Sequence, residues 1–172
     1  MKIKTTSIKG VYLIKPTKFK DKRGKFFESF NEQIFKKKID SKVNFVQDNQ
    51  SLSYKGVLRG LHFQNPPYAQ AKLVSVVKGS VLDVVVDLRK ESKTFGKYIL
   101  EELNEYNNNQ LYIPKGMAHG FLTLEDNTIF TYKCSGLYNK ESEDSIVWND
   151  KSLNIKWNWV KAHAGNPMNE EV

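Results

Sequence analysis

Short apolar runs, each bounded by turn residues, recur along the chain. The three at its centre are Val57–Phe63, Leu73–Val77 and Val81–Val86. A Pro-Pro loop separates the first two, and Gly79–Ser80 separates the last two. Val-rich runs of this length between turns are typical of β-strands, so we expect the three to pair as a central hairpin unit.

Similar runs continue on both sides of this centre. The other expected strands are Val11–Ile14, Lys25–Phe30, Val43–Gln50, Tyr98–Leu103, Gln110–Ile113, His119–Leu124, Ile129–Cys134, Ile146–Trp148 and Leu153–Trp157. A charged loop is expected over Asn139–Ser145. Ser29 followed by Glu32 has capping-box spacing, which predicts one short helix over residues 31–39. Many short strands at steady spacing predict an all-β antiparallel sandwich or barrel.

Length and composition narrow the picture further. The 172 residues show no linker-like break and no repeat, so a single domain over 1–172 is expected. Cys134 is the only cysteine, which excludes an intramolecular disulfide and a multi-cysteine zinc site. The chain has no apolar signal region and no segment of membrane-spanning length. We therefore expect a cytoplasmic protein with no membrane partner.

The formal net charge of +8 raises the question of an anionic partner. Nucleic acid, an anionic membrane or a phosphorylated small molecule would each suit this charge, and a lysine-rich surface without a specific partner also would. The basic residues are scattered and form no basic motif interleaved with aromatics. Nucleic acid is therefore not an expected partner.

Three basic side chains interrupt the first two central runs. Arg59, His62 and Lys72 stand where a plain strand would carry Val or Thr. Strand alternation puts His62 on one face and Arg59 on the other, unless the strand bends. Two cations and an imidazole near one buried surface suit an anionic ligand and a proton transfer. Each residue alone also fits a solvated sheet edge with one core histidine, but their clustering favours a site.

Pro114-Lys-Gly-Met-Ala-His119 fits the P-x-G-x-x-H pattern of the second cupin motif, a hairpin of a jelly-roll barrel. Many cupins bind a metal through this histidine and two further histidines with a glutamate on an earlier hairpin. Here that hairpin offers only His62-Phe63-Gln64, without the second histidine. A first-row metal needs three or four such ligands. We expect no metal and no cofactor.

Several longer segments occur together in a definite order. They are residues 21–30 (DKRGKFFESF), 45–51 (FVQDNQS), 56–64 (GVLRGLHFQ), 69–74 (AQAKLV), 81–97 (VLDVVVDLRKESKTFGK), 113–124 (IPKGMAHGFLTL), 132–134 (YKC) and 148–157 (WNDKSLNIKW). Their order and spacing resemble the dTDP-4-dehydrorhamnose 3,5-epimerases, metal-free cupins of nucleotide-sugar biosynthesis. The resemblance covers nearly everything from Val11 to Trp157. It implies a cupin-type jelly-roll barrel and a homodimer that shares N-terminal strands within residues 1–30.

The implied reaction is cofactor-free epimerisation at C3 and C5 of a dTDP-4-keto-6-deoxy-hexose, which gives dTDP-4-dehydro-L-rhamnose. Hydrogens on C3 and C5 are acidic because the C4 carbonyl can take up charge as an enolate. Inversion needs a base, an acid on the opposite face, and a cation near O4. The resemblance assigns these tasks to His62, Tyr132 and Lys72, respectively. The pKa of an unperturbed imidazole lies near neutrality, which suits proton abstraction.

The resemblance also implies contacts with the nucleotide-diphosphate sugar. Arg23 and Arg59 match residues that bind the diphosphate, a task that suits the forked guanidinium. The positions that match residues around the nucleotide, some from a partner subunit, are Phe26, Glu28, Gln47 and Asn49. His119 and Tyr138 match residues at the sugar end of the pocket.

The tail over residues 158–172 departs from the family pattern. Relatives carry an aspartate there that orients the catalytic histidine, whereas this chain has no aspartate after Asp150. Asn169 or Glu170 is a candidate for that region. The alternatives are a C3-only epimerase, an isomerase of a related nucleotide-linked 4-keto sugar, and a nucleotide-sugar binding relative without catalysis.

Overall fold

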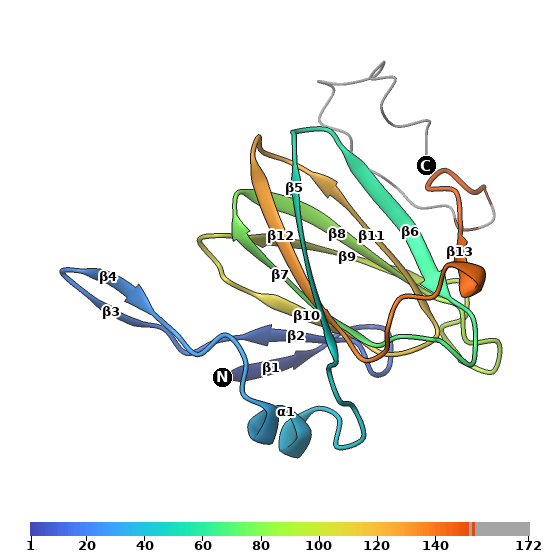
Figure 1. The fold of residues 1–172 in the computed structure, drawn as a ribbon, viewed down its shortest axis with the longest axis horizontal. Helices are drawn as coiled ribbons and strands as arrows, with labels where there is room; N and C mark the ends of the chain where they lie inside the picture. Colours follow the sequence, from blue (N-terminus) through green and yellow to red (C-terminus); the bar gives the residue numbers. More distant parts are fainter. Residues whose placement is uncertain (152, 154–172) are drawn as a thin grey trace.

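Two antiparallel β-sheets face each other in the computed structural model, which describes residues 1–151 and 153 (Figure 1). One sheet has the order β1 (Lys2–Thr5), β2 (Tyr12–Lys15), β10 (Gln110–Ile113), β7 (Lys72–Lys78), β12 (Thr128–Cys134) and β5 (Gln47–Ser53). The other has the order β13 (Glu143–Ser145), β6 (Leu58–Gln64), β11 (Met117–Thr123), β8 (Ser80–Asp87) and β9 (Tyr98–Asn104). The predicted all-β, cupin-type sandwich is confirmed.

The β8 strand shows how sequence alternation builds the core. Val81 and Val85 point between the sheets and join the central core, whereas Val84 and Val86 pack on the outer face of the same sheet. All four side chains are fully buried. A strand covered on both faces reads as a continuous apolar run. The β8 run is continuous except at Asp83, which lies between the inward valines and is therefore the informative position.

Helix α1 (Glu32–Lys38) covers the outer face of the six-stranded sheet through Phe35, which is buried against Phe30 and Phe45. The helix is where the sequence predicts it, but the predicted Ser29 cap is wrong. Asn31 is the N-cap, and its Oδ1 accepts a hydrogen bond from Ile34 N at 3.1 Å. Asparagine is as good an N-cap as serine, and it lies directly before the first helical residue.

The three central runs form strands, but their expected pairing with one another is wrong. The β6 strand pairs with β11 and β13, β7 with β10 and β12, and β8 with β9 and β11. Gly79 therefore carries the chain from one sheet to the other rather than closing a hairpin. Its φ is +79°, and a Cβ there would lie 2.3 Å from Thr128 Oγ1. A tight turn signal does not reveal whether two strands pair or change sheets.

Further boundaries differ from expectation. Of the expected strand Lys25–Phe30, only residues 25 and 26 lie in a strand, which spans Gly24–Phe26. The β5 strand begins at Gln47, because the preceding Val43 and Phe45 pack against the helix instead. Within the expected loop 139–145, residues 143–145 form the edge strand β13, and residues 146–148 form no strand. Charged residues suit a solvent-facing edge, which a search for apolar runs overlooks. The expected strand 153–157 lies outside the described residues except for Leu153.

The short strands β3 (Phe19–Asp21) and β4 (Gly24–Phe26) form a hairpin that projects from the body of the molecule (Figure 1). The exposed fractions of Phe19 and Phe26 are 63% and 71%. Lys25, the middle residue of β4, donates through Nζ to Asn108 Oδ1 at 3.0 Å. Large aromatic side chains exposed on a projecting arm are typical of a surface that another molecule covers.

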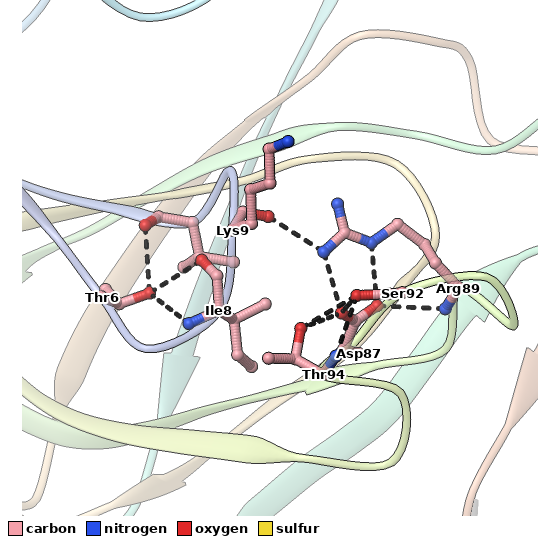
Figure 2. Close-up of polar contacts among 8 residues, drawn as sticks. Thr6, Ile8, Lys9, Asp87, Arg89, Ser92 and Thr94 are labelled. Carbon is pink, nitrogen blue, oxygen red and sulfur yellow. Dashed lines mark hydrogen bonds and ion pairs between the residues drawn. The ribbon is translucent and has the colours of Figure 1, made fainter.

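Asp87, at the end of β8, is the acceptor of a polar cluster that we call the Asp87 cluster: Asp87, Arg89, Ser92 and Thr94 (Figure 2). Arg89 donates through Nε to Oδ1 and through Nη2 to Oδ2, both at 2.8 Å. The Ser92 and Thr94 hydroxyls each donate to Oδ2 at 2.6 Å. Arg89 Nη2 also donates to Lys9 O at 2.9 Å, which ties the loop after β8 to the N-terminal turn.

Candidate active site

A cavity of about 280 Å³ lies between the two sheets. Most of the residues that line it carry a polar side chain, and two aromatic rings close its inner end. Phe121 and Phe130 stack there with ring centroids 4.1 Å apart. The cavity is lined by Gln47, Asn49, Ser51, Arg59, His62, Phe63, Gln64, Gln70, Lys72, His119, Gly120, Phe121, Phe130, Tyr132, Cys134, Tyr138 and Glu143.

The six-stranded sheet supplies one wall through neighbouring residues of β7, β12 and β5. Lys72 is paired with Cys134, which is paired with Gln47 on the other side. The next inward row places Tyr132 opposite Asn49. Directly paired residues share a face of a sheet, so these polar side chains gather on one wall. Gln47 Nε2 donates to Asn49 Oδ1 at 3.0 Å, which orders this row.

The five-stranded sheet supplies the opposite wall, where a bulge resolves the orientation of Arg59. His62 is paired with His119, and Arg59 is paired with Phe121. Three residue steps on β6 thus match two on β11, which is a β-bulge. The extra residue restores Arg59 to the same side as His62, and both line the cavity. The strand therefore has the bend that would place Arg59 on the same face as His62, which the sequence analysis gave as the alternative to regular alternation.

Glycine makes this bulge feasible. Gly60 has a φ of +121°, and a Cβ on it would lie 2.5 Å from Gly120 Cα and 2.7 Å from His119 O. Glycine adopts a positive φ without steric cost, and it permits this close approach of two backbones. The Arg-Gly-Leu-His segment therefore requires glycine for the placement of both basic side chains.

Asp83 is a fully buried carboxylate that the sequence prediction of the site missed. Its Oδ1 and Oδ2 atoms lie 3.1 and 2.9 Å from His119 Nε2, a hydrogen-bonded pair that holds the ring in place. Burial raises the pKa of Asp83, while His119 and Lys72 act in the opposite direction. The signal was present in the sequence as one acidic residue inside the apolar β8 run.

The surroundings of His62 and Tyr132 shift the pKa values of these two residues, which are assigned to catalysis. Burial lowers the pKa of His62, and Lys72 and His119 lower it further, whereas Glu143 raises it. Burial raises the pKa of Tyr132. At neutral pH these directions favour an unprotonated imidazole that can accept a proton and a protonated phenol that can donate one.

Lys72 is partly buried, and burial lowers the pKa of its ammonium group, against the attraction of Cys134, Asp83 and Glu143. Among the described residues, it forms no direct ion pair or side-chain hydrogen bond. Burial also raises the pKa of the Cys134 thiol beside it. An ammonium group without a fixed carboxylate partner in the cavity wall is available to an anionic ligand.

Eight predicted site residues line the cavity, and three do not. Those that line it are His62, Lys72, Tyr132, Gln47, Asn49, Arg59, His119 and Tyr138. Arg23, Phe26 and Glu28 lie instead on or just after the projecting β3–β4 hairpin, away from this chain's own cavity. Arg23 is bound there by Asp21, with Nη2 2.6 Å from Oδ2. The tail positions Asn169 and Glu170 lie outside the described residues.

Glu143, Gln64 and Gln70 line the cavity without having been predicted. Glu143 was missed because its edge strand was expected to be a loop. No group of three or more His, Cys, Asp or Glu side chains in the described part of the chain is arranged to hold a metal ion. None of the helices in that part is both long and apolar enough to span a bilayer.

Facing antiparallel sheets and an acid–base cavity between them define a cupin-type enzyme built for proton transfer. Comparison with known proteins makes this specific. The sequence pattern of the dTDP-4-dehydrorhamnose 3,5-epimerases matches residues 5–169, and the chain belongs to that family.

Individual relatives agree with this assignment. The dTDP-4-dehydrorhamnose 3,5-epimerase of Shigella flexneri is 52% identical over 157 residues, which are 91% of this chain and 87% of the relative. The enzyme of Elizabethkingia anophelis has a solved structure with a TM-score of 0.89 and 50% identity, covering 94% of this chain and 88% of that one. An epimerase structure from Legionella pneumophila, in complex with dTDP-4-keto-L-rhamnose, gives a TM-score of 0.90 and 43% identity, covering 97% and 88%.

Proposed function

We propose that the protein epimerises dTDP-4-dehydro-6-deoxy-D-glucose at C3 and C5 to dTDP-4-dehydro-L-rhamnose. The observation that carries this proposal is the distribution of acid–base groups over the two cavity walls. His62 lies on the five-stranded sheet, whereas Tyr132 and Lys72 lie on the six-stranded sheet. A sugar ring between these walls has a base on one face and an acid on the other, as inversion requires.

The reaction proceeds through an enolate. His62 removes the proton from the carbon next to the C4 carbonyl, and the electron pair of the broken C–H bond moves into the enolate. Lys72 stabilises the negative charge that develops on O4. Tyr132 returns a proton to the opposite face of the same carbon. Its raised pKa keeps the phenol protonated until that step.

The nucleotide-diphosphate end of the substrate lies toward Arg59, whose Nε donates to Ser53 Oγ at 3.0 Å. Ser51 Oγ is buried in the cavity lining and has no hydrogen-bond partner among the described residues, so it can serve a ligand. We assign Gln47 and Asn49 to the nucleotide side, and His119 and Tyr138 to the sugar side. The Arg59 guanidinium and the side-chain amides of Gln47 and Asn49 suit a diphosphate.

Arg23, Phe26 and Glu28 act in a second copy of the chain. We propose a homodimer in which the β3–β4 hairpin of one protomer completes the cavity of its partner. The exposed aromatics of the hairpin and its distance from its own cavity support this arrangement. Mixing inactive Arg23→Ala protein with inactive His62→Ala protein tests it. A sharing dimer recovers activity through mixed dimers with one intact site, whereas self-contained sites recover none.

Incubation of the sugar nucleotide with the protein in deuterated water tests the proposed reaction. Deuterium at both C3 and C5, with L-configured product, is the expected result. Deuterium at C3 alone would identify a C3-only epimerase. No incorporation at either carbon would leave a nucleotide-sugar binding protein or an isomerase of another sugar, and it would overturn the proposal.

A further inference from the structure

Glu143 approaches the imidazole of His62 from the edge of the five-stranded sheet. Its Oε1 lies 3.9 Å from His62 Nδ1. In the β13–β6 pairing, Glu143 is opposite Gln64 and Ser145 is opposite His62, so Glu143 and His62 are diagonal neighbours on one face. Long side chains can interact across such a diagonal. The approach therefore follows from strand register rather than from a chance surface rotamer.

The second carboxylate oxygen of Glu143 is held separately. Tyr138 Oη donates to Glu143 Oε2 at 2.7 Å, which leaves Oε1 facing His62. The segment that carries Tyr138 is itself fixed to the cavity strands. Tyr138 N donates to Gln47 Oε1 at 3.0 Å, and Asn139 N donates to Gln64 Oε1 at 2.8 Å. The carboxylate is thus oriented by a connected set of hydrogen bonds.

We propose that Glu143, oriented by Tyr138, is a positioning residue that directs the Nδ1 edge of His62 and leaves Nε2 free to act as the base. The separation of 3.9 Å is longer than a hydrogen bond, so the interaction is electrostatic. A carboxylate near Nδ1 favours the tautomer that carries its proton on that nitrogen. This inference rests on the proposed function only where it names His62 as the base.

The proton balance explains why a carboxylate helps. His62 Nε2 forms a bond to the substrate proton, the C–H electron pair passes to the enolate, and the imidazole gains one positive charge. Glu143 stays ionised throughout and stabilises that charge. It therefore acts on the step through His62 and does not itself exchange a proton with the sugar.

Other groups around His62 disfavour its protonated, positively charged form. Lys72 on β7 and His119 on β11 lower the pKa of His62, as does burial, while Tyr132 on β12 is neutral in its protonated form. Asp83 is occupied by His119. In the described part of the chain, Glu143 is the group whose charge raises the pKa of His62. The side chain of Glu143 is 38% exposed, so water screens part of its effect until substrate covers the cavity.

The test compares Glu143→Gln with wild type by nitrogen NMR titration of His62 in the substrate-free protein. The chain has three histidines, so the signals can be assigned with single variants. Loss of the carboxylate should lower the pKa of His62 and reduce the fraction of its Nδ1–H tautomer. The acidic limb of the kcat/KM profile should move to lower pH, and kcat should fall roughly tenfold, less than for loss of the base itself.

Two variants control for non-specific effects. Glu141→Gln removes an exposed carboxylate from the adjacent 3-10 turn, outside the cavity lining, and should leave the His62 titration unchanged. Glu143→Asp keeps the charge and should retain more activity than Glu143→Gln. An unchanged His62 titration in Glu143→Gln overturns the proposal.

Wild-type protein offers a second measurement in case Glu143→Gln does not fold. The carboxyl carbon of Glu143 should show an inflection at the pKa of His62, because coupling is reciprocal. Its absence likewise overturns the proposal. Both titrations need no substrate, so failure of the proposed function, seen as full activity in His62→Ala, is distinguishable from failure of the Glu143 assignment.

Discussion

Asp83 and Asp87 lie on the same strand, β8, and point to the same side of it, because they are separated by two alternations. Both are fully buried. Asp87 accepts hydrogen bonds from Arg89, Ser92 and Thr94, and these lower its pKa well below the ordinary value although burial alone would raise it. Among the residues that the structure describes, Asp83 is hydrogen-bonded to His119 alone, and burial raises its pKa.

The difference separates a structural carboxylate from a functional one. In the Asp87 cluster, the carboxylate charge is compensated by donors from a few residues of the following loop. Removal of either partner of such a fully hydrogen-bonded buried ion pair is strongly destabilising. At the cavity, the Asp83 carboxylate interacts electrostatically with both His119 and Lys72. The positive charge of Lys72 is therefore only partly compensated. The proposed role of Lys72 at the substrate oxygen requires an ammonium group with such incomplete compensation.

Asp87→Asn should give the largest loss of stability. It leaves Arg89 without its carboxylate, and we expect a loss of about 3 kcal/mol in the free energy of unfolding at pH 7. This is the low end for a broken buried pair, because the Arg89 side chain is 32% exposed and can be hydrated. Chemical denaturation measures it, with kcat of the folded fraction close to wild type.

The pH dependence sharpens this expectation. The folded-state pKa of Asp87 lies below its unfolded value, so its contribution is present above the ordinary Asp pKa and is lost as pH falls. The cost of Asp87→Asn should therefore shrink in acid. Glu91→Gln, an exposed change in the same loop, should stay within about 0.5 kcal/mol of wild type. Equal losses of stability in Asp87→Asn and Glu91→Gln would show that the Asp87 cluster makes no special contribution.

Thr94→Val removes one hydroxyl of the cluster, which contacts both Asp87 and Ser92, with little change in side-chain volume. The Thr94 hydroxyl donates to Asp87 Oδ2 at 2.6 Å. A hydrogen bond to a charged group contributes about 1.5–3 kcal/mol, and the loss should fall near the lower value because Arg89 and Ser92 still serve the carboxylate. Thermal unfolding measures the change. A loss as large as that of Asp87→Asn would mean that the hydroxyl, not the ion pair, dominates.

Asp83→Asn should change stability least, by about 1 kcal/mol or less at neutral pH, and with the opposite pH slope. The folded-state pKa of Asp83 is raised, so its contribution is complete below the ordinary Asp pKa and is lost as pH rises through the folded value. The variant lacks that loss, so its stability relative to wild type should improve with rising pH. Denaturation at several pH values checks the slope, and a slope like that of Asp87→Asn contradicts the comparison.

The two aspartates also show which contacts can be predicted from the sequence alone. Both aspartates stand in the same Val-rich run, and the partners of Asp87 follow it within seven residues. The partner of Asp83 is 36 residues away on β11, and only strand register brings them together. The approach of Glu143 to His62 depends on the register of the polar edge strand β13, which the apolar pattern does not reveal.

Local apolar pattern predicted most strands and the sandwich, because burial of one or both faces imposes it. It did not predict which strands pair, since the Gly79 turn fits a hairpin and a sheet crossing equally well. Eight of the site residues follow from resemblance and line one cavity. In the homodimer we propose, the hairpin residues Arg23, Phe26 and Glu28 act in the second chain, which the sequence of one chain does not place.

His62 and Tyr132 are proposed to serve different halves of one proton exchange from opposite cavity walls. Solvent deuterium exchange into the sugar, followed by NMR in His62→Ala and Tyr132→Phe, tests it most directly. His62→Ala should abolish exchange at both carbons, because no enolate forms. Tyr132→Phe should slow inversion by about 10²–10⁴-fold while His62 continues to exchange a proton on its own face. Loss of exchange as complete in Tyr132→Phe as in His62→Ala would contradict the division of roles.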